Sequence, residues 1–125
     1  MESTIHLNLS EDFYTLCTIY QIKPEYFVQK LIDQVSLPEY YSNPNENNRY
    51  GTLFFLQFIG QEEENCDVND ELEDHYLTAF NDAMHYNFDA TPAATETCLS
   101  TGRNIMRQWL KAVLAERSKY LTDNL

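Results

Sequence analysis

The sequence is poor in the residues that break or loosen a chain. Its 125 residues include three glycines and four prolines, too few for a collagen-like or low-complexity chain. Hydrophobic residues make up 43% and aromatic residues 14%, which is the composition of a folded domain and not of a disordered tail. At this length we expect one domain's worth of chain, with two small lobes as the alternative.

Cysteine is scarce, and its spacing matches no known framework. Cys17, Cys66 and Cys98 are odd in number, far apart and form no C-x-x-C pair. Neither a zinc ribbon nor a disulfide framework is therefore indicated. We expect reduced thiols, no cofactor and a cytoplasmic location.

Long apolar runs are absent as well. The longest is LFFL, residues 53–56, and the opening MESTIHLNL has no basic segment followed by an apolar one. A helix that spans a bilayer needs roughly 20 mostly apolar residues. We expect a protein that is neither secreted nor bound to a membrane.

Basic residues are few, and their distribution is uneven. Eight Lys and Arg stand against 20 acidic residues, a net charge of −12. Residues 50–102 contain no Lys or Arg, whereas residues 103–119 contain five and a single acid. Phosphate backbones and anionic lipids attract clustered bases, so the composition argues against generic binding to either. The acidic region 61–89 would instead suit a basic partner protein.

Near the N-terminus, apolar and polar residues alternate. This period predicts a strand with one buried face. The apolar positions are Ile5, Leu7 and Leu9, and the polar ones are Thr4, His6 and Asn8. Ser10 and the two acids after it predict the N-cap of a helix that runs to about Gln21.

A second amphipathic helix follows. Pro24 suits a first helical position, and Pro38 is expected to end the helix soon after its apolar stripe. The stripe consists of Phe27, Val28, Leu31, Ile32 and Val35. SNPNENN, residues 42–48, consists of residues that favour turns and predicts a loop. We therefore expect an N-terminal unit, residues 1–41, a linker, 42–49, and an acidic helical region, 50–125.

The region 50–125 is predicted to be helical. YGTLFFLQFIG, residues 50–60, is apolar all round and allows a buried helix or a strand; we prefer the helix. Asn69 or Asp70 can cap a helix through about Phe88. The last helix shows apolar residues at helical spacing, expected in the core: Ile105, Met106, Trp109, Leu110, Val113 and Leu114. The predicted fold class is mainly α with one short strand.

The order strand, capped helix, turn and second helix within residues 3–37 resembles the N-terminal unit of the ribbon-helix-helix family. The resemblance implies a homodimer, in which the strand pairs with its copy and the two helices share a core. The residues placed in this dimer core are Ile5, Leu7, Leu9, Phe13, Leu16, Phe27 and Leu31. It also implies that Thr4, His6 and Asn8 would contact bases in duplex DNA and that Lys23 would contact phosphate.

Two other stretches of the sequence could suggest a metal site or a catalytic loop. Glu71, His75, Asp82 and His85 share one helical stripe, which could bind a metal, but the stripe lies opposite Phe80 and is best explained as a solvated face. CLSTGR, residues 98–103, resembles a cysteine phosphatase loop only loosely. We interpret this stretch instead as the start of a helix, with Ser100 or Thr101 as its N-cap and Gly102 in its first turn. We expect no metal site, no catalytic residues and no enzyme.

Two functions remain open at this point. The first is a dimeric DNA-binding transcriptional regulator, possibly antitoxin-like. The alternative is a non-enzymatic interaction module that keeps the dimer, has lost DNA binding and uses its acidic surface to bind a basic protein.

Overall fold

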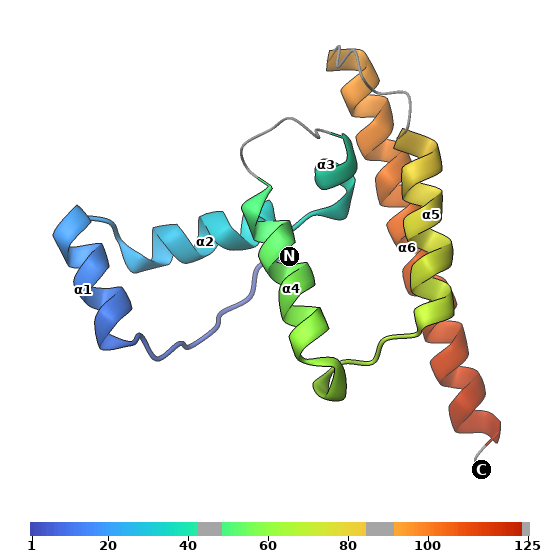
Figure 1. Ribbon diagram of the computed structural model, residues 1–125, viewed down its shortest axis with the longest axis horizontal. Helices are drawn as coiled ribbons and strands as arrows, with labels where there is room; N and C mark the ends of the chain where they lie inside the picture. The colour runs from blue at the N-terminus through green and yellow to red at the C-terminus, as the bar shows by residue number, and fades with distance from the viewer. Residues whose placement is uncertain (43–48, 85–91, 124–125) are drawn as a thin grey trace. The chain divides into compact units, whose positions relative to one another are not determined.

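The computed structural model describes residues 1–42, 49–84 and 92–123 and divides into two compact units, Met1–Asp33 and Gln34–Leu125 (Figure 1). Helices make up most of the described chain, as expected from the sequence. The division falls before the predicted linker 42–49, of which residues 43–48 lie outside the described residues. Each unit is considered by itself.

The first unit contains two helices that begin where the sequence predicts. Helix α1, Glu11–Tyr20, is capped by Ser10, whose Oγ accepts the amide hydrogen of Phe13 at 3.2 Å. Gln21 then adopts the left-handed conformation, with φ 55°, and ends the helix. Helix α2, Pro24–Gln34, starts at the proline.

The predicted N-terminal strand is wrong. Residues 1–10 have no regular secondary structure, and the described residues contain no strand anywhere. A strand is held by hydrogen bonds to a neighbouring strand, and alternation supplies a face but no such neighbour. The ribbon-helix-helix assignment is therefore also wrong, because that unit requires a strand.

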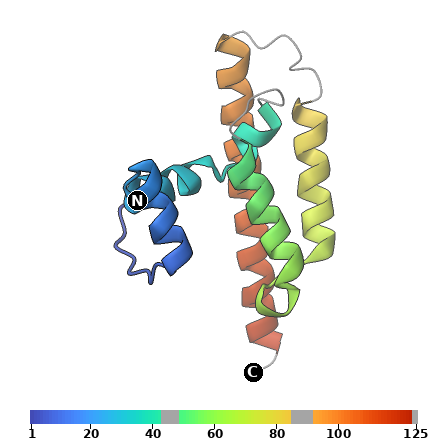
Figure 2. The same ribbon diagram turned by 60° about the vertical axis from the view of Figure 1, so that its left-hand side comes forward.

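The second unit is built on a long C-terminal helix. Its elements are α3 (Leu37–Ser42), α4 (Tyr50–Gln61), the single 3₁₀ turn η1 (Glu63–Asn65), α5 (Asp70–Met84) and α6 (Pro92–Asp123). Helices α3, α5 and α6 contact one another, and α5 runs alongside α6 (Figures 1 and 2). The preference for a helix over residues 50–60 is confirmed. No helix among the described residues combines the length and the apolarity needed to cross a membrane.

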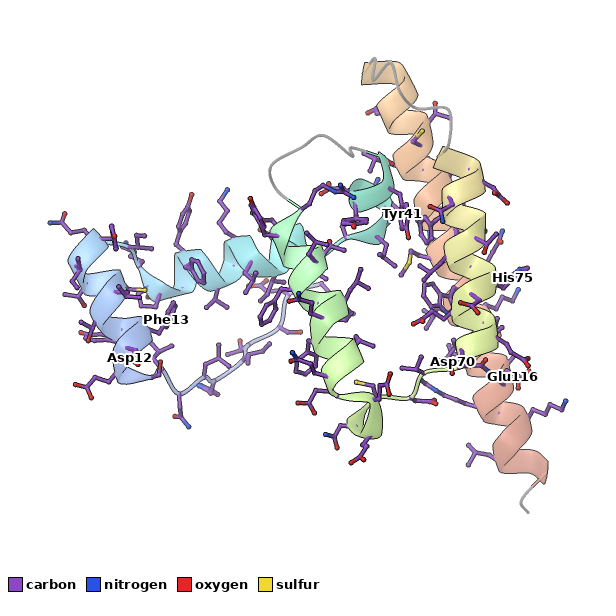
Figure 3. All side chains as sticks on the ribbon, in the orientation of Figure 1. Asp12, Phe13, Tyr41, Asp70, His75 and Glu116 are labelled. Carbon is purple, nitrogen blue, oxygen red and sulfur yellow. The ribbon has the colours of Figure 1, made fainter. Side chains whose placement is uncertain are left out.

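The core of the second unit lies where α3, α5 and α6 meet. Phe80 is fully buried and Ile105 nearly so. The ring of Tyr41, on α3 and labelled in Figure 3, stacks on the ring of Phe80, with 5.1 Å between the ring centroids. Farther along, Tyr76 stacks on Trp109 at 5.9 Å. Aromatic stacking between three helices thus fixes this part of the fold.

Helix α4 is attached to the chain before α3 by one buried side chain. The hydroxyl of Thr52 accepts the amide hydrogen of Ser36 at 2.9 Å and donates to the carbonyl of Gln34 at 2.9 Å. Thr52 is 2% exposed. Its two hydrogen bonds satisfy backbone groups that would otherwise be costly to bury.

Two predicted helix boundaries need correction. Pro38 does not end α2 but lies in the first turn of α3, a position where proline is tolerated. Helix α6 begins at Pro92, so Ser100, Thr101 and Gly102 lie in its interior and not at its entry. Gly102 is buried there, and its lack of a side chain suits close packing.

Candidate functional site

The residues expected to contact DNA lie outside regular secondary structure. Thr4, His6 and Asn8 are exposed on the irregular segment before α1. Lys23 is exposed ahead of α2, and its carbonyl accepts the amide hydrogens of Tyr26 and Phe27. Base contacts were expected from a two-stranded ribbon, and residues 1–10 do not form the strand that such a ribbon needs.

The residues expected in a dimer core are only partly brought together. Phe13 and Phe27 are in contact, with ring centroids 5.5 Å apart (Figure 3 labels Phe13). Leu31 is half-buried, whereas Leu16 is 54% exposed. Ile5, Leu7 and Leu9, in the irregular segment before α1, are all exposed. The homodimer itself stays a prediction.

The possible metal stripe lies on the surface of α5. Glu71, His75 and Asp82 are exposed, and His85 lies outside the described residues. His75 makes an edge contact with the ring of its neighbour Tyr76 at 4.8 Å. Figure 3 shows Asp70 and His75 on this helix. Within the described parts of the chain, no cluster of three or more His, Cys, Asp or Glu side chains could hold a metal ion.

A groove with a volume of about 620 Å³ lies between α4 and α6 in the second unit. Helix α4 lines it with Thr52, Phe55, Leu56 and Ile59. Helix α6 lines it with Arg103, Met106, Trp109, Leu110, Val113 and Arg117. The segments 35–38 and 66–69 and Glu73 complete the walls. We call this feature the α4–α6 groove.

The spacing of the lining residues makes the groove long. On α6 they recur every three or four residues from Arg103 to Arg117, which corresponds to roughly 21 Å of helix. On α4 they run from Thr52 to Ile59, about 10 Å. Both helices thus present a continuous stripe of one face to the groove.

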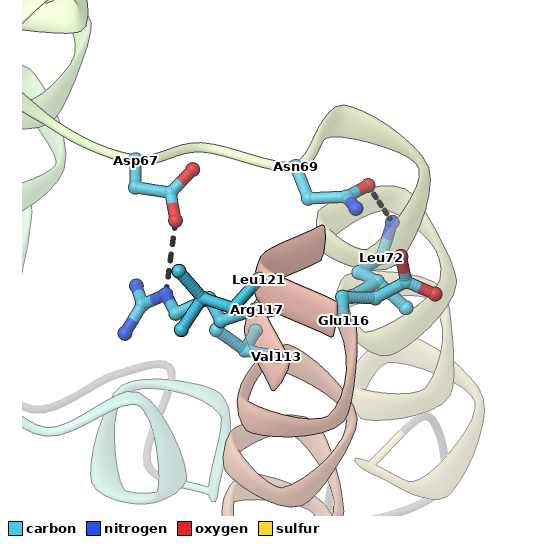
Figure 4. A pocket seen from close by; sticks show the side chains of 7 residues that line it. All are labelled: Asp67, Asn69, Leu72, Val113, Glu116, Arg117 and Leu121. Carbon is cyan, nitrogen blue, oxygen red and sulfur yellow. Dashed lines mark hydrogen bonds and ion pairs between the residues drawn. The ribbon is translucent and has the colours of Figure 1, made fainter. Parts of the chain in front are cut away.

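The groove is mostly apolar, with Arg103 at one end of its α6 wall and Arg117 at the other. Arg117 and Asp67 form an ion pair there, with 2.9 Å between Nε and Oδ2 (Figure 4). Both side chains are more than half exposed, so the pair is worth roughly 0 to 1 kcal/mol. A second hollow of about 570 Å³ shares these two residues and continues toward Leu121. The concave surface therefore extends beyond the ion pair.

The apolar side chains that line the groove are substantially open to solvent. Phe55 is 47% exposed and Leu56 40%, although α4 is apolar on every side. On α6, Met106 is 37% exposed and Leu110 58%. Apolar side chains that gather on one exposed surface are typical of interaction sites.

Sequence reasoning misassigned this surface. Met106, Leu110 and Leu114 were expected in the core, but α6 buries Ile105 and half-buries Trp109 while leaving those three exposed. The width of the apolar stripe on α6 could have indicated that part of this helix stays exposed. A helix that packs on one neighbour needs one narrow stripe, and α6 has apolar residues over more than that.

Acidic residues flank the groove on its α5 side. Residues 62–82 include nine Asp and Glu and no Lys or Arg. The groove wall includes Glu73 and Asp67 from this segment, and Asp70 begins α5 next to it. The segment beside the groove is therefore acidic, whereas the groove lining itself holds two acids, Asp67 and Glu73, and two bases, Arg103 and Arg117.

Comparison of the sequence with protein-family models finds no match, and comparisons with curated proteins and with solved structures find none either.

Proposed function

We propose that this protein is a non-enzymatic interaction module whose α4–α6 groove binds an amphipathic helix of a basic partner protein. The observation that carries the proposal is the long, solvent-open, apolar lining of the groove beside an acidic flank. Helix-in-groove recognition places apolar anchors at positions i, i+3, i+4 and i+7 of the bound helix.

The length of the groove favours a helix over a small molecule. About 21 Å along α6 corresponds to about 14 residues of a bound helix, or four turns. Apolar side chains that protrude from one face of such a helix would remove Phe55, Leu56 and Leu110 from water. Burial of a side chain of this size contributes roughly 1.5 to 3 kcal/mol.

The charge favours a basic partner. The chain carries −12, and residues 62–82 contribute −9 of it with no base. Complementary charge at the rim of an interface raises the association rate and selects among partners. Duplex DNA is a poorer match, because its phosphates are attracted by clustered bases and residues 1–33 contain only Lys23 and Lys30.

The groove offers a surface for binding and few side chains that could act as nucleophile or base. Among its described lining residues there is one thiol, Cys66, and no histidine, so a nucleophile with an adjacent imidazole base is not formed there. All three cysteines are free, which suits the reducing cytoplasm in which we place the module.

Trp109 allows a direct test, because it is the only tryptophan and lies in the groove. The probe is a synthetic peptide of about 18 residues with leucine at i, i+3, i+4 and i+7, lysine on the other face and no tryptophan. On titration into the full chain, Trp109 emission is expected to shift to shorter wavelength with saturation. A peptide with glutamate in place of lysine is expected to bind at least about tenfold more weakly.

A matched pair of variants tests the location. Leu110→Glu adds one negative charge inside the groove and is expected to weaken binding at least about tenfold. Gln108→Glu adds the same charge to an exposed position of α6 outside the groove and is expected to leave affinity within about twofold. Equal affinity of both variants, or no saturable shift with the wild type, would overturn the proposal.

A further inference from the structure

The helices around the α4–α6 groove run in defined directions. Tyr76 of α5 stacks on Trp109 of α6. Phe80 comes later on α5 and belongs to the same buried cluster as Ile105, which comes earlier on α6. Helices α5 and α6 are therefore antiparallel, as Figures 1 and 2 show. The start of α5 consequently lies beside the C-terminal part of α6.

Helix α4 points in the same direction as α6 (Figures 1 and 2). After α4 ends at Gln61, the chain reaches Asp67, which pairs with Arg117 near the C-terminal end of α6. The ends of both helices thus share one end of the groove, which we call the Arg117 end. The opposite end contains Arg103 and is called the Arg103 end.

The charged side chains that line the groove are divided unequally between these ends. At the Arg117 end, Asp67 already pairs with Arg117, whereas the half-buried carboxylate of Glu73 has no ion pair or hydrogen bond to another described residue. Glu73 belongs to this end because it lies in the first turn of α5. At the other end, the exposed guanidinium of Arg103 likewise has no partner in the described part of the chain. The lining therefore leaves an uncompensated carboxylate at the Arg117 end and an uncompensated guanidinium at the other.

We infer that the partner helix binds the α4–α6 groove antiparallel to α6, with a basic N-terminal half at the Arg117 end and its C-terminus at the Arg103 end. This inference rests on the proposed function and adds the direction and the charge pattern of the partner. A helix carries partial positive charge on its first amides and partial negative charge on its last carbonyls. In this direction the amide end faces Glu73 and the carbonyl end faces Arg103, so both ends meet opposite charge.

The position of Glu73 explains why the bases belong in the first half of the partner helix. A lysine there can pair with Glu73 without breaking the pair between Asp67 and Arg117. Because Glu73 is half-buried, such a pair is partly shielded from water, and shielding strengthens the attraction. A lysine in the last turns would instead approach Arg103, and like charges brought together at an interface lower affinity. The groove thus distinguishes between basic helices by where their bases lie.

Two peptides of identical composition test the direction. Both keep the leucine positions of the lysine-rich peptide and have blocked termini. On the polar face, the forward peptide carries lysine in its first half and glutamine in its second half, and the reversed peptide exchanges the two. With Trp109 emission of the full chain as the readout, the forward peptide is expected to bind at least about fivefold more tightly. Lysine near an N-terminus weakens a free helix, so intrinsic helicity favours the reversed peptide and cannot produce this order.

A matched pair of variants locates the contact. Glu73→Gln removes a charge from the groove wall and is expected to weaken binding of the forward peptide at least about threefold, with less than about twofold change for the reversed peptide. Glu71→Gln removes the same charge from an exposed position of α5 outside the groove lining. It is expected to change neither affinity by more than about twofold.

A nitroxide label on the forward peptide reports the direction itself. On the first residue it is expected to broaden the amide resonances of residues 113–117 more than those of 102–106, and on the last residue the reverse. The opposite broadening pattern, equal affinity of the two peptides, or equal losses in Glu73→Gln and Glu71→Gln would overturn this inference. The proposed function would then stand, because the peptides still bind. No saturable change in Trp109 emission with either peptide would overturn both.

Discussion

Phe80 is the residue on which the packing of the second unit depends most. It has no exposed surface and contacts side chains from α3 and α6, including the stacked ring of Tyr41. Truncation of a buried phenylalanine removes its transfer free energy and leaves a cavity. We expect Phe80→Ala to lower the free energy of unfolding by about 3 to 5 kcal/mol.

Chemical denaturation measures this change, and Phe54→Ala provides the control. Phe54 is 62% exposed on α4, so its truncation is expected to change the free energy of unfolding by no more than about 0.5 kcal/mol. Similar losses in the two variants would contradict the description of the core.

Tyr41 is expected to make the stability of the core depend on pH. Burial raises the pKa of its phenol above the usual value of 10.0, Tyr40 raises it further, and the positive charge of Arg49 lowers it. The unfolded phenol therefore ionises first as the pH rises. Stability from this group is fully present below pH 10 and is lost as the pH rises toward the raised folded pKa.

Tyr41→Phe keeps the ring and removes the ionisable group. We expect the wild type to lose more thermal stability than Tyr41→Phe between about pH 9 and pH 11. The midpoint of thermal unfolding, followed by circular dichroism at both pH values, measures the difference. An equal loss in both proteins would exclude Tyr41 as the source.

Thr52 determines how α4 is held to the chain. Its hydroxyl contacts both Ser36 and Gln34, and α4 has few other packed residues. Thr52→Val keeps the shape but leaves those backbone groups without their partner, which costs roughly 1 to 3 kcal/mol. The matched control is Thr18→Val, because Thr18 donates to the carbonyl of Tyr14 at 2.9 Å on exposed α1.

Denaturant unfolding and hydrogen exchange of α4 report the two variants. Thr52→Val is expected to destabilise the second unit and to speed exchange in α4, whereas Thr18→Val should do neither. Unchanged exchange in α4 of Thr52→Val would show that other contacts hold this helix.

Local signals predicted most helix starts. Ser10 as a cap and Pro24 as a first helical residue act within one turn of the chain, so their effect is visible in the sequence. Asn69 likewise accepts the amide hydrogen of Leu72 at 3.1 Å ahead of α5. The strand failed because it depends on a partner, which alternation at Ile5, Leu7 and Leu9 cannot supply.

The groove could not be predicted from the same signals. Apolar spacing on α6 correctly places Ile105 inside, but the identical spacing places Leu110 at 58% exposure. Which stripe of a helix is covered depends on the positions of its neighbours, and α3 and α5 are the helices that pack on α6. Periodicity gives the apolar faces and does not say which of them remain open.

At the scale of the whole molecule, both units leave large apolar side chains exposed, and most of the net negative charge lies in the second unit. Residues 62–82 carry nine acids beside the groove, whereas residues 1–33 carry a net charge of −3. This distribution of charge supports the proposal that the second unit binds a basic partner.

Hydrogen exchange of the full chain, with and without the lysine-rich peptide, tests the central claim most directly. The account predicts that the peptide slows exchange in residues 52–59 and 103–117, which form the two long walls of the α4–α6 groove. Residues 11–34 are expected to be unaffected. Slower exchange confined to residues 1–33, or no change in either wall at saturating peptide, would contradict it.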